Sequence, residues 1–304
     1  MEGRFRARFG IPVLNKFGEK IYVDQMTVEE LKERVKKSDI VFLPCGSIEN
    51  HGPAAPVGED SFIGTYIAER VAYETGVSVA PPIWYGSHPS HHYGMIGTIP
   101  VEKWAYISYV RSVAKWLIHS GFKKVILFNS HGQEYVLPIV KDILIVEDRV
   151  KALIVTFSWW DFVKDILKVG TELAPGVKIE TPFIHADEVE TSVTLYVVPE
   201  LVDRSKLPIS KADKMVGVVP DKWVDKAGNV YNRPIAWFSV SHYPEVKTYP
   251  KGVVGDASKA SEKKGGPIVE TAVKRIIEFV EWLKSEWPPG KVPEVWLPEE
   301  VFKF

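Results

Sequence analysis

The sequence is almost without cysteine, since Cys45 is the only one among 304 residues. An internal disulfide is therefore excluded, and so is a structural zinc site built from several thiolates. Long apolar runs are also lacking: none approaches the ~20 residues of a transmembrane helix, and the first nine residues lack the apolar core of a signal peptide. We therefore expect a cytoplasmic protein that does not enter membranes.

Neither sign of charge is in excess, because 38 Lys and Arg residues are balanced by 39 Asp and Glu residues, giving a net charge of −1. Nothing in this balance indicates a nucleic acid or an anionic membrane as a partner. Apolar residues make up 45% of the chain and charged residues 25%, which is ordinary for a globular protein. The composition thus argues against the nucleic-acid-binding and membrane classes.

What the chain does contain is a regular alternation of short apolar runs with longer amphipathic segments. Such alternation predicts an α/β fold, with a largely parallel sheet and helices on both of its faces. The first helix is expected to begin with a capping box, since Thr27 is followed three residues later by Glu30, and Gly76 is expected to end the second helix. The predicted strands lie at 40–43, 78–81, 125–128 and 152–157, and the predicted helices at 28–37, 61–74, 100–121, 135–146 and 267–286.

The length of 304 residues allows one large domain or two. We expect a single domain over 1–304, because the proline-rich stretch at about 207–246 has too little apolar periodicity to bury an interior of its own. That stretch is predicted to be an irregular excursion from the core. The last segment, at about 287–304, is predicted to be a non-helical tail that docks on the protein or on a partner subunit.

The tryptophans divide into two groups. Trp104, Trp116 and Trp282 occur at helical spacing among apolar neighbours, which predicts core packing. Trp84, Trp159 and Trp160 instead follow predicted strands, on the side where ligand sites of parallel sheets lie. For these three, both a core position and a pocket position are open.

The most informative stretch follows the first apolar run and holds Glu49, His51 and, nine positions later, Asp60. In an extended segment, residues two apart point to the same side, so Glu49 and His51 can face one point. Oxygen and nitrogen ligands without thiolate suit Zn, Mn or Fe(II). A lone Glu-x-His pair is more often a turn-capping carboxylate beside a surface histidine, so the metal hypothesis depends on the other motifs.

Two further motifs carry similar groups. The apolar run at 125–128 leads into Asn129-Ser130-His131-Gly132, as an active-site loop leaves the carboxyl end of a parallel strand. Farther along, His185 and Glu188 are three residues apart and share one face if the segment is helical. Glu190, five residues after His185, is expected to point well away from it. Three such motifs together favour one shared site.

Histidines also gather in the loop at 87–92, which reads Ser-His-Pro-Ser-His-His. A third metal site is one interpretation of this run. Pro89 interrupts it, however, and the surrounding residues are typical of a loop. We therefore predict that Ser87 and His88 line a substrate pocket instead.

In combination these motifs resemble those of the creatininase (creatinine amidohydrolase) family. The resemblance rests on Gly-Ser-Ile-Glu-Asn-His-Gly with Asp60, on Asn-Ser-His-Gly and on His-Ala-Asp-Glu-Val-Glu-Thr-Ser, and it extends from about 27 to 284. The segment 158–165 is similar to a tryptophan-bearing segment of creatininase. The resemblance implies a three-layer αβα sandwich, two divalent metal ions per chain (Zn, Mn or Fe) with a bridging water, and a homo-oligomer, commonly a hexamer.

The resemblance also implies a role for most motif residues. Glu49 and His131 match the ligands of one metal ion. His51 matches a ligand of the other ion, and Asp60 matches the carboxylate that bridges both. His185 matches the catalytic histidine of the family.

One ligand of the family is missing from this chain. The family's glutamate two positions after the second-motif histidine is Gln133 here, and an amide oxygen is a poor substitute beside a dication. Glu188 is expected to supply the carboxylate and to take part in catalysis, since creatininase has an apolar residue at that position. Glu190 and Glu134 are the alternatives. Gln133 is then expected to face the substrate.

The substrate-contacting groups depart further from the family. Trp160 matches an aromatic residue that covers the substrate, and we expect it to do so here. Gly132, however, replaces a tyrosine of creatininase, and Thr181-Pro182 replaces a substrate-contacting Trp-Asp pair. We expect Gly132 to line the pocket and creatinine not to be the substrate.

The predicted reaction is hydrolysis of a small polar cyclic substrate by metal-activated water, with His185 carrying the proton to the leaving group. A cyclic amide is the expected substrate. The alternative is a cyclic 1,3-diketone, because the family includes a carbon–carbon hydrolase of inositol breakdown, the 3-dehydro-scyllo-inosose hydrolase. Two alternatives of other classes stay open: a non-catalytic oligomeric scaffold with a vestigial metal site, and a mononuclear Fe(II) oxygenase.

Overall fold

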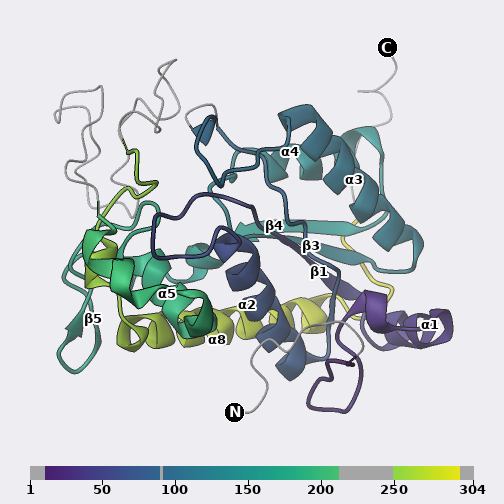
Figure 1. Ribbon diagram of the computed structural model, residues 1–304. Coiled ribbons are helices and arrows are strands. Elements are labelled where there is room, and N and C mark those ends of the chain that lie inside the picture. The colour runs from purple at the N-terminus through teal and green to yellow at the C-terminus, as the bar shows by residue number, and fades with distance from the viewer. Residues whose placement is uncertain (1–10, 90–91, 212–248, 295–304) are drawn as a thin grey trace.

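The computed structural model describes residues 11–89, 92–211 and 249–294, and the other residues are drawn as a thin grey trace in Figure 1. Most of the predicted excursion at about 207–246 therefore lies outside the described residues. So does the part of the predicted tail beyond residue 294. The single-domain organisation stays a prediction.

The centre of the molecule is a sheet of four parallel strands in the order β2-β1-β3-β4. Figure 1 labels β1, β3 and β4 of this sheet. Each strand matches a predicted one to within two residues. The strands are β1 (Ile40–Cys45), β2 (Ser78–Val79), β3 (Lys124–Asn129) and β4 (Leu153–Ser158). All residues of β1 and β3 are buried, as expected of central strands covered on both faces.

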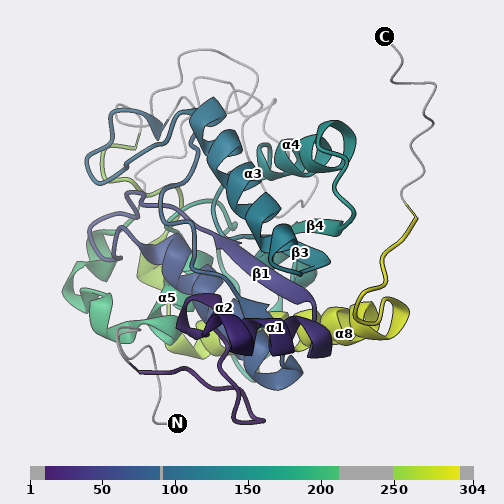
Figure 2. The ribbon, with the colours of Figure 1, turned by 90° about the vertical axis from the view of Figure 1, so that its right-hand side faces the viewer.

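Helices cover both faces of this sheet (Figure 2). Alternate β1 residues point to opposite faces, so Phe42 belongs to one apolar core and Leu43 to the other. The first core includes residues of α2 (Glu59–Thr75), α5 (Glu188–Val197) and α8 (Glu262–Glu286). The second includes residues of α3 (Lys103–His119) and α4 (Leu137–Asp142). The predicted αβα architecture is confirmed.

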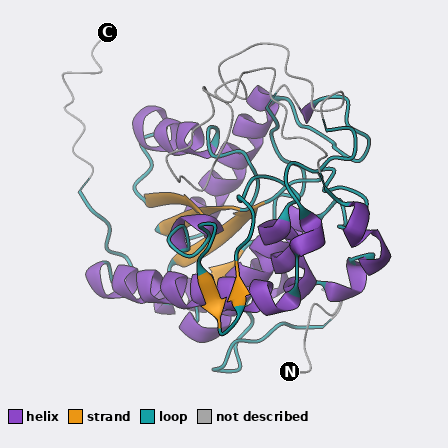
Figure 3. Cartoon of the chain, turned by 90° about the vertical axis from the view of Figure 1, so that its left-hand side faces the viewer, coloured by secondary structure: helices purple, strands orange, loops and turns teal. Residues whose placement is uncertain are grey.

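Local signals place several helix ends correctly. Helix α1 (Val28–Lys37) has the expected capping box, in which Glu30 N–H donates to Thr27 Oγ1 at 3.3 Å and Thr27 N–H donates to Glu30 Oε2 at 2.7 Å. Gly76 ends α2 in the left-handed region, with φ of 74°. The remaining elements are 3-10 helices at Val23–Gln25, Trp159–Phe162, Pro199–Leu201, Arg204–Ile209 and Ala257–Lys259, a π-helix at Ile143–Glu147, and a separate hairpin of β5 (Glu172–Ala174) and β6 (Val177–Lys178) (Figure 3).

The predicted start of the last helix at residue 267 is wrong. Helix α8 begins at Glu262 and carries Pro267 in its interior. Its first turns pack against α5 so closely that a Cβ on Gly265 would lie 1.9 Å from the Ser192 carbonyl oxygen. This packing, available only to glycine, stabilises helical turns that the local sequence does not favour.

The core positions predicted for three tryptophans are also wrong. Trp104, Trp116 and Trp282 are 72%, 65% and 53% exposed. Helical spacing correctly predicts that the three tryptophans lie on helices, but it does not decide which face of a helix meets the core. Within the described ranges, no helix is long and apolar enough to cross a membrane.

Candidate metal centre

The predicted ligands gather at the carboxyl edge of the sheet. Cys45, the last residue of β1, pairs with Asn129, the last residue of β3. Glu49 and His51 follow β1, and His131 follows β3, so both loops leave the sheet side by side. Ligand sites of parallel sheets generally lie at the carboxyl edge, because the loops that leave neighbouring strands meet there.

Helix α2 reaches this edge because small residues allow a close approach. A Cβ on Gly46 would lie 2.4 Å from Ser61 Oγ, and a Cβ on Gly64 would lie 2.4 Å from Ser130 Oγ. Neither distance is tolerable for a real side chain. The two glycines thus let the first turn of α2, with Asp60, lie directly against the loops that follow β1 and β3.

The structure brings together the four residues predicted to form the cage. His131 Nδ1 lies 2.9 Å from Glu49 Oε2 and 3.1 Å from Asp60 Oδ2. The other carboxylate oxygen of Asp60 lies 3.4 Å from His51 Nε2. Asp60 therefore faces both histidines, one with each oxygen, as a carboxylate that bridges two ions must. All four side chains are buried.

Hydrogen bonding in this cage fits a bound cation. His51 Nδ1 lies 3.1 Å from the Glu49 carbonyl oxygen, which fixes the proton on Nδ1 and leaves the lone pair of Nε2 facing inward. Buried polar atoms normally have partners. Among the described residues, however, the close contacts of His51 Nε2, Asp60 Oδ2 and both ring nitrogens of His131 lack the geometry of hydrogen bonds. A divalent ion would satisfy atoms of this kind.

The electrostatics of the cage also favour positive charge. Burial alone would lower the pKa of His131, but the carboxylates of Glu49 and Asp60 outweigh it and raise this pKa to about 10. Burial likewise opposes ionisation of Glu49, yet the neighbouring histidines hold its pKa well below the usual range. The metal-free protein thus holds protons at a place where a dication can replace them.

Glu188 is not brought into this cage, which corrects the expected ligand assignment. Asp187 caps α5 and Glu188 is its first residue, so His185 lies before the helix and shares no helical face with Glu188. The Glu188 carboxylate instead accepts hydrogen bonds from Lys264 Nζ at 2.6 Å and from the N–H of Thr181 at 2.6 Å. It forms a buried ion pair away from the cage.

Glu190, the first alternative, faces the cage instead. Its Oε2 lies 3.9 Å from His51 Nε2 and 3.7 Å from His185 Nδ1. Its expected direction away from His185 is wrong, because Ala186 adopts a left-handed φ of 49° and turns the chain just before α5. Of the described acidic groups, Glu190 joins His51 and Asp60 within ligand distance of one ion, and Glu134 joins no such group.

Two variants should separate the roles of these glutamates. Glu188→Gln should lower the free energy of unfolding by about 3 kcal/mol, because Lys264 loses its buried counter-charge, and should leave metal binding intact. Glu190→Gln should instead weaken binding of one metal ion at least about 10-fold, with little change in stability. Urea unfolding of metal-free protein and metal analysis after dialysis measure both effects. The reverse pattern would restore Glu188 as the ligand.

Comparison with known proteins agrees with this geometry. A family model described as Creatininase: Creatinine amidohydrolase matches residues 24–280. The chain belongs to the creatininase family. A 3-dehydro-scyllo-inosose hydrolase of Thermotoga maritima is 44% identical over 275 residues, 90% of this chain and 86% of that protein. The creatinine amidohydrolase of Pseudomonas putida is 25% identical over 279 residues, 88% of this chain and 98% of that protein.

Solved structures of the creatininase family share the fold. One named creatininase Mn matches with a TM-score of 0.69 at 26% identity, over 88% of this chain and 99% of that chain. A mutant creatininase of Zn-Zn type matches with a TM-score of 0.69 at 25% identity, over 88% of this chain and 98% of that chain. Since the relatives are named hydrolases, this chain is a hydrolase of a metal-dependent family, and its buried His and Glu cluster can hold metal.

His185, the predicted catalytic histidine, lies beside the cage. Its ring centroid is 4.6 Å from that of His51. Its Nε2 lies 2.9 Å from the Asn50 carbonyl oxygen, which places the proton on Nε2 and leaves Nδ1 able to accept one. Burial is the main cause that lowers the pKa of His185 to about 4. The imidazole is therefore neutral near pH 7.

The residues predicted to contact a substrate occupy different environments. Ser87 N–H donates to Gln133 Oε1 at 3.0 Å, and Gln133 Nε2 donates to the Cys45 carbonyl oxygen at 3.2 Å. Ser87 and Gln133 are fully buried, so they tie the loop at 87 to the end of β1 rather than face a ligand. Gly132 differs, since no described atom lies within 4 Å of a Cβ built on it. It borders open space.

Trp160 lies in the apolar core, with only 3% of its surface exposed. It packs edge-on against Phe183, with ring centroids 6.0 Å apart, and no described residue accepts a hydrogen bond from its Nε1. Trp159 is 1% exposed in the same core. The core position is the one observed for this pair, and it differs from the expected position of Trp160 over the substrate.

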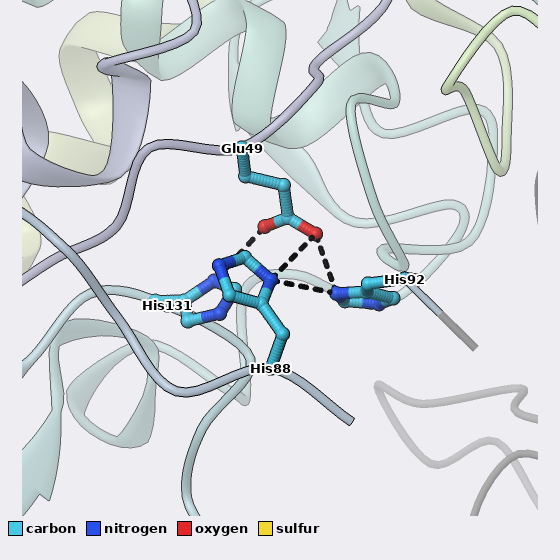
Figure 4. A group of neighbouring side chains, drawn as sticks. All are labelled: Glu49, His88, His92 and His131. Carbon is cyan, nitrogen blue, oxygen red and sulfur yellow. Dashed lines mark hydrogen bonds and ion pairs between the residues drawn. The ribbon is translucent and has the colours of Figure 1, made fainter. Parts of the chain in front are cut away.

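His88 and His92 lie beside Glu49 (Figure 4), a contact that the sequence does not predict, although a metal site is one interpretation of their loop. His88 was expected to line a substrate pocket, but it is 3% exposed and both its ring nitrogens face protein groups. The signal that could have revealed the pair is the spacing of four residues between the two histidines. Pro89 between them obscures that signal, because it argues against a helix.

Proposed function

We propose that this protein hydrolyses a carbon–carbon bond in a small polyhydroxylated cyclic 1,3-diketone of the 3-dehydro-scyllo-inosose type. The observation that carries the proposal is the 44% identity to a hydrolase of that name, against 25% to a creatinine amidohydrolase, over similar lengths. A cyclic amide, the substrate class first expected from the sequence, becomes the second candidate.

The reaction consumes one water and needs no redox partner. Hydroxide adds to one ring carbonyl, and the bond from this carbon to its neighbour between the two carbonyls then breaks. The electron pair of that bond forms an enolate with the second carbonyl, and the enolate carbon takes up a proton. The product is an open-chain keto acid. The leaving carbon departs readily because the second carbonyl delocalises its charge.

The chain offers five side chains to hold two divalent ions. Glu49 and His131 would bind one ion, His51 and Glu190 the other, and Asp60 both. When bound, such ions supply a nucleophilic hydroxide at neutral pH and stabilise negative charge that develops on a carbonyl oxygen. Zn, Mn and Fe(II) all suit these oxygen and nitrogen donors.

His185 is placed to move the proton in this reaction. Its Nδ1 is the accepting nitrogen, because Nε2–H donates to the Asn50 carbonyl oxygen. A neutral imidazole takes a proton from the attacking water and delivers it to the leaving carbon. For a cyclic amide the same proton would go to the leaving nitrogen, so this step alone does not separate the two substrate classes.

Creatinine recognition is the step for which the chain is least suited. Thr181, which stands at one position of the substrate-contacting pair of creatininase, donates through Oγ1 to Glu188 Oε2 at 2.7 Å. Its side chain is thus committed to the buried ion pair. Gln133 is fully buried and bound to backbone groups. Both observations favour a substrate other than creatinine.

A direct comparison of substrates tests the proposal. Protein reconstituted with Mn or Zn should hydrolyse an inositol-derived 1,3-diketone with a kcat/KM at least about 100-fold above that for creatinine, a difference of about 2.7 kcal/mol. Proton NMR of the product should reveal an open-chain keto acid. Protein stripped with a chelator is the control and should be inactive. Faster hydrolysis of creatinine or a hydantoin would favour the cyclic-amide alternative.

Two features expected from the sequence stay predictions. One is a homo-oligomer, with six subunits as the expected number, which light scattering on the purified protein would measure. The other is the cytoplasmic location.

A further inference from the structure

Two histidines outside the set of family ligands lie against the far side of Glu49. His92 Nδ1 is 2.8 Å from Glu49 Oε1, and His88 Nδ1 is 3.9 Å from the same oxygen. The two Nδ1 atoms are 3.1 Å apart. Glu49 directs its other oxygen, Oε2, toward His131 at 2.9 Å. Figure 4 shows the three imidazole rings arranged around this one carboxylate.

The four side chains have the dimensions of a metal site. One ligand atom from each of Glu49, His88, His92 and His131 lies within 4.8 Å of all the others. A tetrahedral ion with bonds of about 2.1 Å separates its ligands by about 3.4 Å, so small side-chain shifts would bring all four atoms onto one ion. None of the four residues is more than 7% exposed.

A second contact orients His88 for this role. Its Nε2 lies 2.7 Å from the hydroxyl oxygen of Ser47, which is fully buried. Imidazoles that bind metals almost always use the second ring nitrogen to hold a protein partner in this way. A histidine that binds a substrate would instead direct one ring nitrogen into an open pocket.

We propose that His88 and His92 join His131 and Glu49 as ligands of one metal ion, forming a site of three imidazoles and one carboxylate. The inference rests on the proposed function only in taking Glu49 and His131 as metal ligands. Three imidazoles favour Zn(II) or Fe(II) over Mn(II) or Mg(II) at this position. With Glu49 they can also hold this ion without Asp60. We therefore expect a higher metal affinity at this site than at the site of His51 and Glu190.

The decisive experiment counts imidazoles around zinc in the absence of substrate. Asp60→Asn protein loaded with one equivalent of Zn should give an X-ray absorption spectrum with about three imidazoles per ion. A spectrum with one imidazole would overturn the inference, since that is the number expected for His131 with Glu49 alone, or for His51 with Glu190. Because no turnover is involved, failure of the diketone assay and failure of this inference are distinguishable.

Binding measurements provide the independent check. In otherwise unaltered protein, the double variant His88→Gln, His92→Gln should weaken one Zn site at least about 100-fold in calorimetric titration, because even partners of ligands contribute 10- to 100-fold. Ser47→Ala should weaken the same site by about 10-fold. His119→Gln, which replaces an exposed histidine at the end of α3, is the matched control. Two sites of parental affinity in the double variant would contradict the assignment.

Discussion

Asp60→Asn should abolish turnover, with a fall in kcat of at least about 10³-fold. Asp60 is the carboxylate that faces both His51 and His131, with Oδ1 3.4 Å from the first and Oδ2 3.1 Å from the second. Losing it would remove the proposed bridge between two ions, and a metal pair contributes several kcal/mol of charge stabilisation in the transition state. Because each factor of ten in rate corresponds to 1.36 kcal/mol, a loss of several kcal/mol lowers kcat by three or more powers of ten.

Metal analysis and turnover of the diketone, measured on the same samples, check this expectation. Bound metal should fall from about two ions per chain to about one. Asp165→Asn is the control, because it also removes a carboxylate but from an exposed ion pair with Arg275. Its turnover should change less than about twofold. Two ions and parental turnover in Asp60→Asn would show that Asp60 is not a bridging ligand.

His185→Ala should lower kcat by about 10²- to 10⁴-fold, the usual contribution of a positioned acid or base, and should leave both metal ions in place. His185 is held by the Asn50 carbonyl oxygen, and its accepting Nδ1 is beside Glu190. Its proposed role is proton transfer, whereas His51 and His131 direct ring nitrogens toward the carboxylates of the cage, as metal ligands would. Activity and metal content should therefore separate in this variant.

The matched control is again His119→Gln, which should keep both activity and metal. Rescue by added imidazole would support the role in proton transfer, because a small base can occupy the space left by the side chain. A variant that loses one metal ion along with activity would instead make His185 a ligand, an arrangement that its distance of 3.9 Å from Glu49 Oε1 also permits.

The parts predicted correctly are those that local sequence specifies. An apolar run followed by a polar turn marks the carboxyl end of a buried strand, and parallel strands bring such ends together regardless of the details of packing. That rule is enough to place Glu49, His51 and His131 at one edge. The capping box at Thr27 and the glycine that ends α2 are equally local, since each depends on residues within one helical turn.

The parts predicted wrongly depend on partners that are distant in sequence. Glu188 was expected at the metal, but its counter-ion is Lys264, 76 residues later on α8. The start of α8 follows from contact of Gly265 with α5. The contact of His92 with Glu49 was not predicted, because a different loop supplies Glu49. No local pattern contains information about any of these contacts.

The sequence by itself determined the class of fold, the family and the chemical types of ligand, because apolar periodicity and short motifs act over a few residues. Tertiary structure decided which carboxylate faces the cage, which histidines surround Glu49 and which aromatic residues are buried. The physical reason is that a side chain's direction depends on where its helix begins and on what packs against it. The left-handed turn at Ala186 comes just before α5, on which Glu190 faces the cage and Glu188 faces Lys264.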